Sequence, residues 1–140
     1  MRILSAAQDH TYTIPTGGVD PILGNELKVT LVWTDVPAQP ASQNPLVNNL
    51  DLIVTVNGVE SRGNGQIDTI NTVEQVVTTV PAGATATIVV RGTGITQGAQ
   101  KYALVVTGPL QVTSPPPAFP KVRDGVRDRD MDRVRGIWIG

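Results

Sequence analysis

The sequence contains no cysteine among its 140 residues. Disulfides, thiolate catalysis, zinc fingers and iron–sulfur clusters all depend on that side chain and are therefore excluded. Long hydrophobic runs are also lacking, and no segment reaches the ~18 apolar residues that a membrane-spanning helix needs. The opening segment, residues 1–7, is too short an apolar stretch for a signal peptide. We therefore expect no membrane partner, and we expect a secreted form to be part of a longer precursor.

Charged and aromatic residues are scarce, at 16% and 4% of the chain. The 11 basic and 12 acidic side chains give a net charge of −1, so we expect no general attraction for nucleic acid. Glycine and proline are frequent, with 14 and 11 copies, and valine and threonine are abundant. This composition is typical of a turn-rich β protein and argues against a helical bundle.

The charges divide the chain into two parts. Residues 1–110 hold five basic and eight acidic side chains, whereas residues 111–140 hold six basic and four acidic ones. A stiff Ser-Pro-Pro-Pro segment at 114–117 lies near the boundary. The residues after it repeat Val-Arg-Asp and offer little to bury. We predict a β-sandwich domain over 1–110, followed by a Pro-rich linker and a charged, disordered tail over 111–140.

Alternation of apolar and polar residues is the main structural signal. Residues 27–34 and 50–56 both place an apolar side chain at every second position, which is typical of half-buried strands. Asn57-Gly58 is a strong two-residue hairpin turn after the second of these segments. Helical periodicity is missing throughout the body. Further strands are expected over 10–14, 59–62, 72–80, 85–91 and 101–107. The pattern predicts an all-β fold, an antiparallel β-sandwich that is jelly-roll-like and has about seven to eight strands.

Four segments carry a family resemblance. Residues 27–35 read LKVTLVWTD and residues 46–54 read LVNNLDLIV. Together they resemble the signature "LKVTLVWTDP…LVNDLDLVV" of the β-sandwich domain that follows the catalytic domain in some secreted subtilisin-like serine peptidases. Residues 71–76, NTVEQV, are similar to that family's "NNVEQV", and residues 102–108, YALVVTG, are similar to its "FSLVVSG". The resemblance spans roughly residues 9–110. It departs at Asn49, where the family has Asp, at a shortened stretch between 56 and 71, and in the unmatched tail.

The resemblance implies a non-catalytic accessory domain of a secreted, extracellular peptidase. Such a domain packs on the subtilisin-like catalytic domain of its parent chain and supports that domain's stability or substrate engagement. The residues agree with a non-enzymatic role, since His10 is the only histidine and no serine sits in a Gly-x-Ser-x-Gly elbow. A sandwich detached from its partner is expected to expose an apolar patch and to form a homodimer.

Five oxygen-bearing side chains are candidate calcium ligands. They lie at expected strand ends and in the connecting loop, and the two aspartates converge if their strands pair. Ca²⁺ takes six to eight oxygen ligands from carboxylates, amides, carbonyls and water. The related peptidase domains often bind calcium, and the change at position 49 removes one charge from such a site. The alternative is that these residues form ordinary turn hydrogen bonds. The candidates are Asp35, Asn48, Asn49, Asp51 and Glu74.

Two other functions remain open from the sequence. An independent carbohydrate- or cell-surface-binding module would need an exposed aromatic or polar groove. A protein–protein assembly domain would use an exposed strand edge. Trp33, Tyr12 and Tyr102 occupy alternating apolar positions, so we expect them in the core. We expect His10, which follows Asp9, to be exposed rather than part of a pH-sensitive pair.

Overall fold

The computed structural model describes residues 2–19, 22, 24–111 and the backbone of 136–139. The described residues form strands and one short 3₁₀ turn, without an α-helix. No helix in this part of the chain is long and apolar enough to cross a membrane. The elements are β1 (Arg2–Leu4), β2 (Asp9–Pro15), β3 (Glu26–Trp33), β4 (Asn48–Val56), β5 (Val59–Arg62), η1 (Gly63–Gly65), β6 (Val73–Thr79), β7 (Thr85–Ile95), β8 (Gln100–Thr107) and β9 (Gly136–Ile139).

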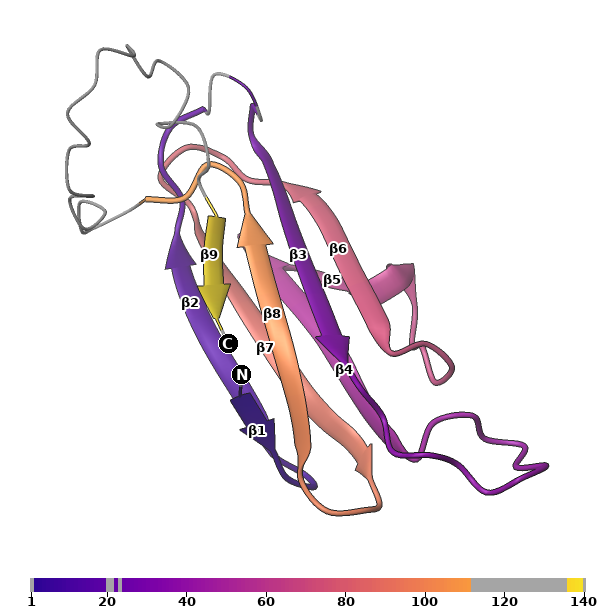
Figure 1. The fold of residues 1–140 in the computed structure, drawn as a ribbon. Coiled ribbons are helices and arrows are strands. Elements are labelled where there is room, and N and C mark those ends of the chain that lie inside the picture. Colours follow the sequence, from indigo (N-terminus) through magenta and orange to yellow (C-terminus); the bar gives the residue numbers. More distant parts are fainter. Residues whose placement is uncertain (1, 20–21, 23, 112–135, 140) are drawn as a thin grey trace, which may run out of the picture.

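The strands form two antiparallel sheets stacked as a sandwich (Figure 1). The front sheet has the order β1–β8–β3–β6, and β9 pairs with β8 beyond the end of β1. The back sheet has the order β2–β7–β4–β5. The pairs β1–β8 and β3–β6 lie in one sheet, and the pairs β2–β7 and β4–β5 lie in the other. This arrangement is the jelly-roll topology. The predicted jelly-roll-like antiparallel sandwich is confirmed.

The core lies between the two sheets and follows from the alternation in the sequence. In β3, Leu27, Val29, Leu31 and Trp33 are all buried, while the side chains between them point away from the core. The inward residues of β4, β7 and β8 complete the same cluster. Trp33 and Tyr102 are buried as predicted, and Tyr12 is half-buried against the cluster.

Three parts of the fold differ from the sequence-based expectation or were not anticipated by it. The expected strand 85–91 continues as β7 to Ile95, through glycines that were expected in a loop. Gly92 is needed there, since a Cβ would lie 2.8 Å from Ile95 Cδ1 and 3.0 Å from the Ser5 carbonyl oxygen. A register shift in β4 between Asn49 and Leu50 faces this stretch.

Two short strands, β1 and β9, were not expected. The predicted Pro-rich linker and disordered tail fall largely on residues 112–135 and 140, which lie outside the described residues.

Candidate functional site

Asp35 anchors the crossover from β3 in the front sheet to β4 in the back sheet. Its Oδ1 accepts hydrogen bonds from the N–H groups of Val36 at 2.8 Å and Asn48 at 3.0 Å. Its Oδ2 accepts one from the N–H of Val47 at 2.7 Å. Trp33 Nε1 adds a bond to the Asn48 carbonyl at 3.0 Å. These bonds join the two ends of the loop, so the side chain of Asp35 has a structural use that needs no ion.

Asn48 fastens the same crossover to the loop between β7 and β8. Its Oδ1 accepts from the N–H groups of Thr96 and Gln97, both at 3.0 Å. Its Nδ2 donates to the Gln97 carbonyl at 2.9 Å and to Gln100 Oε1 at 3.0 Å. Gln100 in turn donates to the Thr34 carbonyl at 2.9 Å, at the end of β3. The buried amide of Asn48 therefore has all its hydrogen-bonding groups in use.

Glu74 links the two sheets near the open edge of the sandwich. It lies on β6 in the front sheet, and its Oε2 accepts the N–H of Leu52 on β4 in the back sheet at 2.7 Å. That N–H lies just beyond the last β4–β5 pair, Ile53 with Arg62, so the carboxylate continues the ladder where β5 ends. A Cβ on Gly63 would lie 2.7 Å from the Glu74 Cβ, so only glycine leaves room for this side chain.

The electrostatics of Glu74 are unusual. The side chain is 1% exposed, and its Oε1 has no hydrogen-bond partner among the described residues. Burial raises the pKa of Glu74 from 4.5 to about 7, against the opposing effect of the Leu52 N–H, and the charges of Asp51 and Asp68 raise it further. Asp51 is itself buried and accepts a hydrogen bond from the Thr93 hydroxyl. Glu74 therefore changes its charge near neutral pH.

The three acidic residues among the five predicted calcium ligands, Asp35, Asp51 and Glu74, do not form one group. The strand that precedes Asp35 and the strand that contains Asp51 lie in different sheets and do not pair with each other, so the condition for their convergence is not met. No group of three or more acidic or histidine side chains in the described residues is placed to hold a metal. The oxygens of Asp35 and Asn48 already accept N–H bonds, while Asn49 Oδ1 is buried without a hydrogen-bond partner in the described part of the chain. Calcium binding stays a prediction.

His10 is half-buried, which corrects the expectation of an exposed side chain. Its Nδ1 lies 2.6 Å from the hydroxyl of Tyr102, and that hydroxyl lies 2.6 Å from the hydroxyl of Tyr12. Burial and the bond to Tyr12 raise the pKa of Tyr102. Asp9 does not pair with His10 and instead forms an exposed ion pair with Arg91 at 2.9 Å. The histidine therefore joins a polar contact between the sheets.

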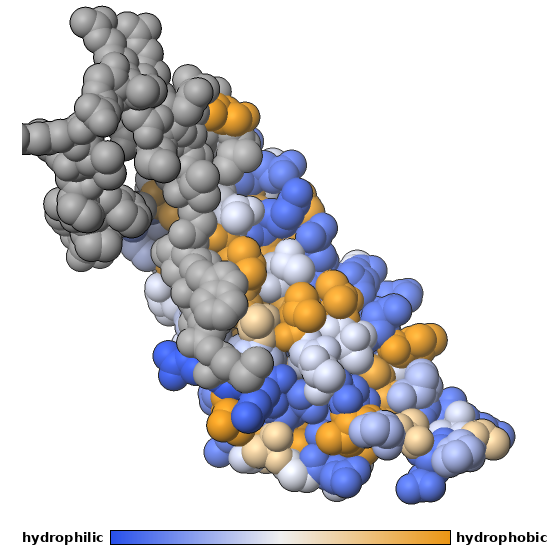
Figure 2. Space-filling view, viewed as in Figure 1, coloured by the Kyte–Doolittle hydropathy of each residue, from blue (hydrophilic) through white to orange (hydrophobic). Residues whose placement is uncertain are grey.

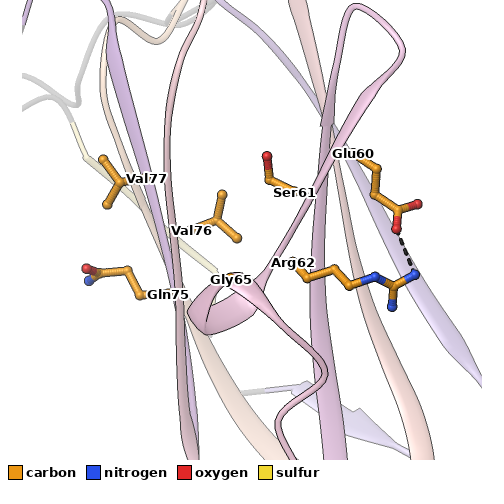
Figure 3. A pocket seen from close by; sticks show the side chains of 7 residues that line it. All are labelled: Glu60, Ser61, Arg62, Gly65, Gln75, Val76 and Val77. Atoms are coloured by element: carbon orange, nitrogen blue, oxygen red, sulfur yellow. Dashed lines mark ion pairs between the residues drawn. The ribbon is translucent and has the colours of Figure 1, made fainter.

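A groove of about 450 Å³ lies between the edge strands β5 and β6 (Figure 3). Val76 points into the gap between the two strands, and Gly65 of η1 closes one end. Arg62 and Glu60 form an ion pair at 2.8 Å on the β5 side. The groove is lined by Glu60, Ser61, Arg62, Gly65, Gln75, Val76 and Val77.

The loop that follows η1 is organised by Asp68, a residue that sequence reasoning missed. Its carboxylate accepts bonds from the side-chain amides of Asn64 and Asn71, both at 2.7 Å. It also accepts the N–H groups of Ile70 at 2.9 Å and Asn71 at 3.0 Å. These hydrogen bonds, that from the Asn71 side chain first, hold the pKa of Asp68 well below its usual range despite its burial. In the sequence, this arrangement is indicated by the spacing Asp-x-Ile-Asn at residues 68–71, because that spacing permits a turn closed by the aspartate side chain.

Comparison with models of known protein families finds no match to this chain, and a search of curated proteins finds none either.

Proposed function

We propose that this chain is a non-catalytic accessory jelly-roll domain of a secreted subtilisin-like peptidase. The observation that carries the proposal is the position of the residues that give the resemblance. Trp33, Asp35 and Asn48 belong to the two best-matching segments, and they form one hydrogen-bonded crossover between the sheets. Because the matching residues fix the path of the chain between the sheets, they support a fold shared with the peptidase accessory domains. The shared fold in turn supports the accessory role.

The proposed contact with the catalytic domain is the front face, defined as the outward side chains of β3, β6 and β8. Val32, Val73 and Val77 on this face are 41%, 47% and 50% exposed. Strand register places Val32 beside both Val73 and Ala103. Figure 2 views this side of the molecule and shows apolar side chains interspersed with polar ones. Burying these valines against a partner would stabilise that partner by mass action.

The test joins this chain to the C-terminus of a subtilisin-like catalytic domain and measures the half-life of peptidase activity on heating. We expect a longer half-life than for the catalytic domain alone, and a loss of that gain in the double variant V32K/V73K. The matched control is Thr13→Lys, an exposed position on β2 in the other sheet. An unchanged half-life with and without the chain would exclude a supporting role.

Calcium is a separate part of the proposal and has its own test. The thermal midpoint of the chain is measured with calcium and with a chelator, for the wild type and for Asp51→Ala. A rise with calcium that is lost in the variant would confirm an ion close to Asp51 and Glu74. Equal midpoints in both conditions would leave the five candidate ligands as structural residues only.

The carbohydrate-binding alternative gains no support from the described aromatic residues. Trp33 and Tyr102 are 3% and 1% exposed, and Tyr12 packs against the core while its hydroxyl contacts Tyr102. Stacking on a sugar requires an open ring face, and none of these three described rings offers one.

A further inference from the structure

The outer edge of β6 has backbone groups that no strand covers. Thr72, just before β6, accepts the N–H of Trp33 at 3.1 Å, and Val80, just after it, donates to the Asn25 carbonyl at 2.8 Å. The N–H and C=O groups of successive residues in a strand point to opposite sides. Those of the even-numbered residues of β6 therefore point toward β3. The N–H and C=O groups of Val73, Gln75, Val77 and Thr79 therefore point to the open edge.

One side chain closes half of this edge. Asn64 Oδ1 accepts the N–H of Gln75 at 3.1 Å, and Asn64 Nδ2 donates to the carbonyl of Val73 at 2.9 Å. The amide of Asn64 thus takes the place that a donor and an acceptor of a neighbouring strand would take. Its Nδ2 is also held by Asp68 at 2.7 Å, which fixes the orientation of the amide. Asn64 has a φ of 55°, a left-handed conformation that asparagine tolerates better than most residues.

The edge of β6 lacks the exposed charges that the edge strands β1, β2 and β5 carry. Glu74 is the only charged residue in the strand, and it is buried. By contrast, β1 carries exposed Arg2, β2 carries exposed Asp9, and β5 carries the ion pair of Glu60 with Arg62. Exposed charges on an edge strand disfavour pairing with another chain. Since β6 presents only uncharged side chains to solvent, its protection falls to Asn64.

We propose that Asn64 is a plug that prevents β6 from pairing with β6 of a second copy of this chain. The strand is self-complementary in the antiparallel sense about a two-fold axis at Val77. In that register Val77 faces Val77, and Gln75 of one copy faces Thr79 of the other, so no like charges meet. The side chain of Asn64 occupies the Val73–Gln75 end of this register and blocks it. The proposal is independent of the peptidase role.

The test removes the plug with Asn64→Gly, because glycine adopts the left-handed backbone without strain. We expect dimers, by light scattering, at a protein concentration at least about tenfold lower than for the wild type. The control is Asn44→Ala, at an exposed position away from β6. Adding Thr79→Pro, which removes an outward N–H, should reverse the effect. The proposal is overturned if N64G associates like the wild type, or if the proline leaves its association unchanged.

A measurement on the wild-type protein keeps the proposal testable if N64G does not fold. Amide hydrogen exchange at Gln75, whose N–H is bound by Asn64, should be at least about tenfold slower than at Val77, whose N–H faces the open edge. Equal exchange rates at the two positions would show that Asn64 does not hold the edge, and would overturn the proposal.

Discussion

A single carboxyl group, that of Glu74, joins the two sheets at the open edge of the sandwich. Its Oε2 continues the backbone ladder of β4 through Leu52, while its Oε1 is buried without a hydrogen-bond partner among the described residues. Burial favours the neutral form more strongly than the single N–H bond favours the charged one, which is why the pKa rises to about 7. The negative charges of Asp51 and Asp68 act in the same direction. The stability of the protein should therefore depend on pH near neutrality.

The predicted pH dependence follows from the sign of this shift. The pKa of Glu74 in the folded protein exceeds its ordinary value of 4.5, so protonation of Glu74 favours the folded state. This contribution to the free energy of unfolding is fully present below pH 4.5 and is lost as the pH rises through about 7. We expect the free energy of unfolding to fall by up to roughly 3 kcal/mol between these limits. Glu74→Gln, which cannot ionise, should remove this fall when both proteins are unfolded in urea from pH 5 to 8. Parallel stability curves for the two proteins would contradict the prediction.

Gly63 is the residue that makes room for Glu74. A Cβ at this position would lie 2.7 Å from the Glu74 Cβ and 2.9 Å from its Cδ. We expect Gly63→Ala to lower the free energy of unfolding by roughly 1–3 kcal/mol through this overlap. Gly18→Ala is the matched control, because nothing lies within 4 Å of a Cβ there. Urea denaturation measures both variants, and an equal effect of the two substitutions would argue against a tight contact at Gly63.

At the scale of elements, the crossover between β3 and β4 depends on one aspartate. Asp35 accepts three backbone N–H bonds, so Asp35→Ala leaves three partly buried donors without their acceptor. We expect a loss of about 2–3 kcal/mol in the free energy of unfolding and faster proteolysis within 36–47. The control is Asp9→Ala, which breaks an exposed ion pair with Arg91 and should cost far less, because solvent screens exposed pairs. A similar small loss in both variants would mean that Asp35 does not anchor the loop.

The strands that alternate regularly were predictable, and those defined by their neighbours were not. Both turn residues of the Asn57-Gly58 hairpin have positive φ, as its sequence predicts. In contrast, β1 is too short to show an alternation of apolar and polar residues. Gly92 and Gly94 in β7 have no side chain whose polarity would indicate a buried or an exposed face. Pairing with β4 keeps this glycine-containing stretch extended. Such elements exist because a partner strand satisfies their backbone groups, which a local pattern does not reveal.

At the scale of the whole molecule, the isolated chain should associate through its front face. Val32 and Val73 lie side by side and exposed on this face, at the end of the β3–β6 ladder. We expect light scattering to show dimers of the wild-type chain at high concentration, and V32K to shift association to higher concentration. Thr13→Lys, on the back sheet, should leave it unchanged. A monomer at every concentration would contradict the prediction.

The all-β class, the main strands and the buried position of Trp33 could be predicted from the sequence alone. These depend on periodicity and motifs within short segments. The three-dimensional arrangement was needed to show that the strand before Asp35 and the strand containing Asp51 lie in different sheets, that Glu74 reaches Leu52 in the other sheet, and that Asn64 covers the edge of β6. Each of these contacts depends on which strands become neighbours, and that choice is made by the packing of two sheets around a common core.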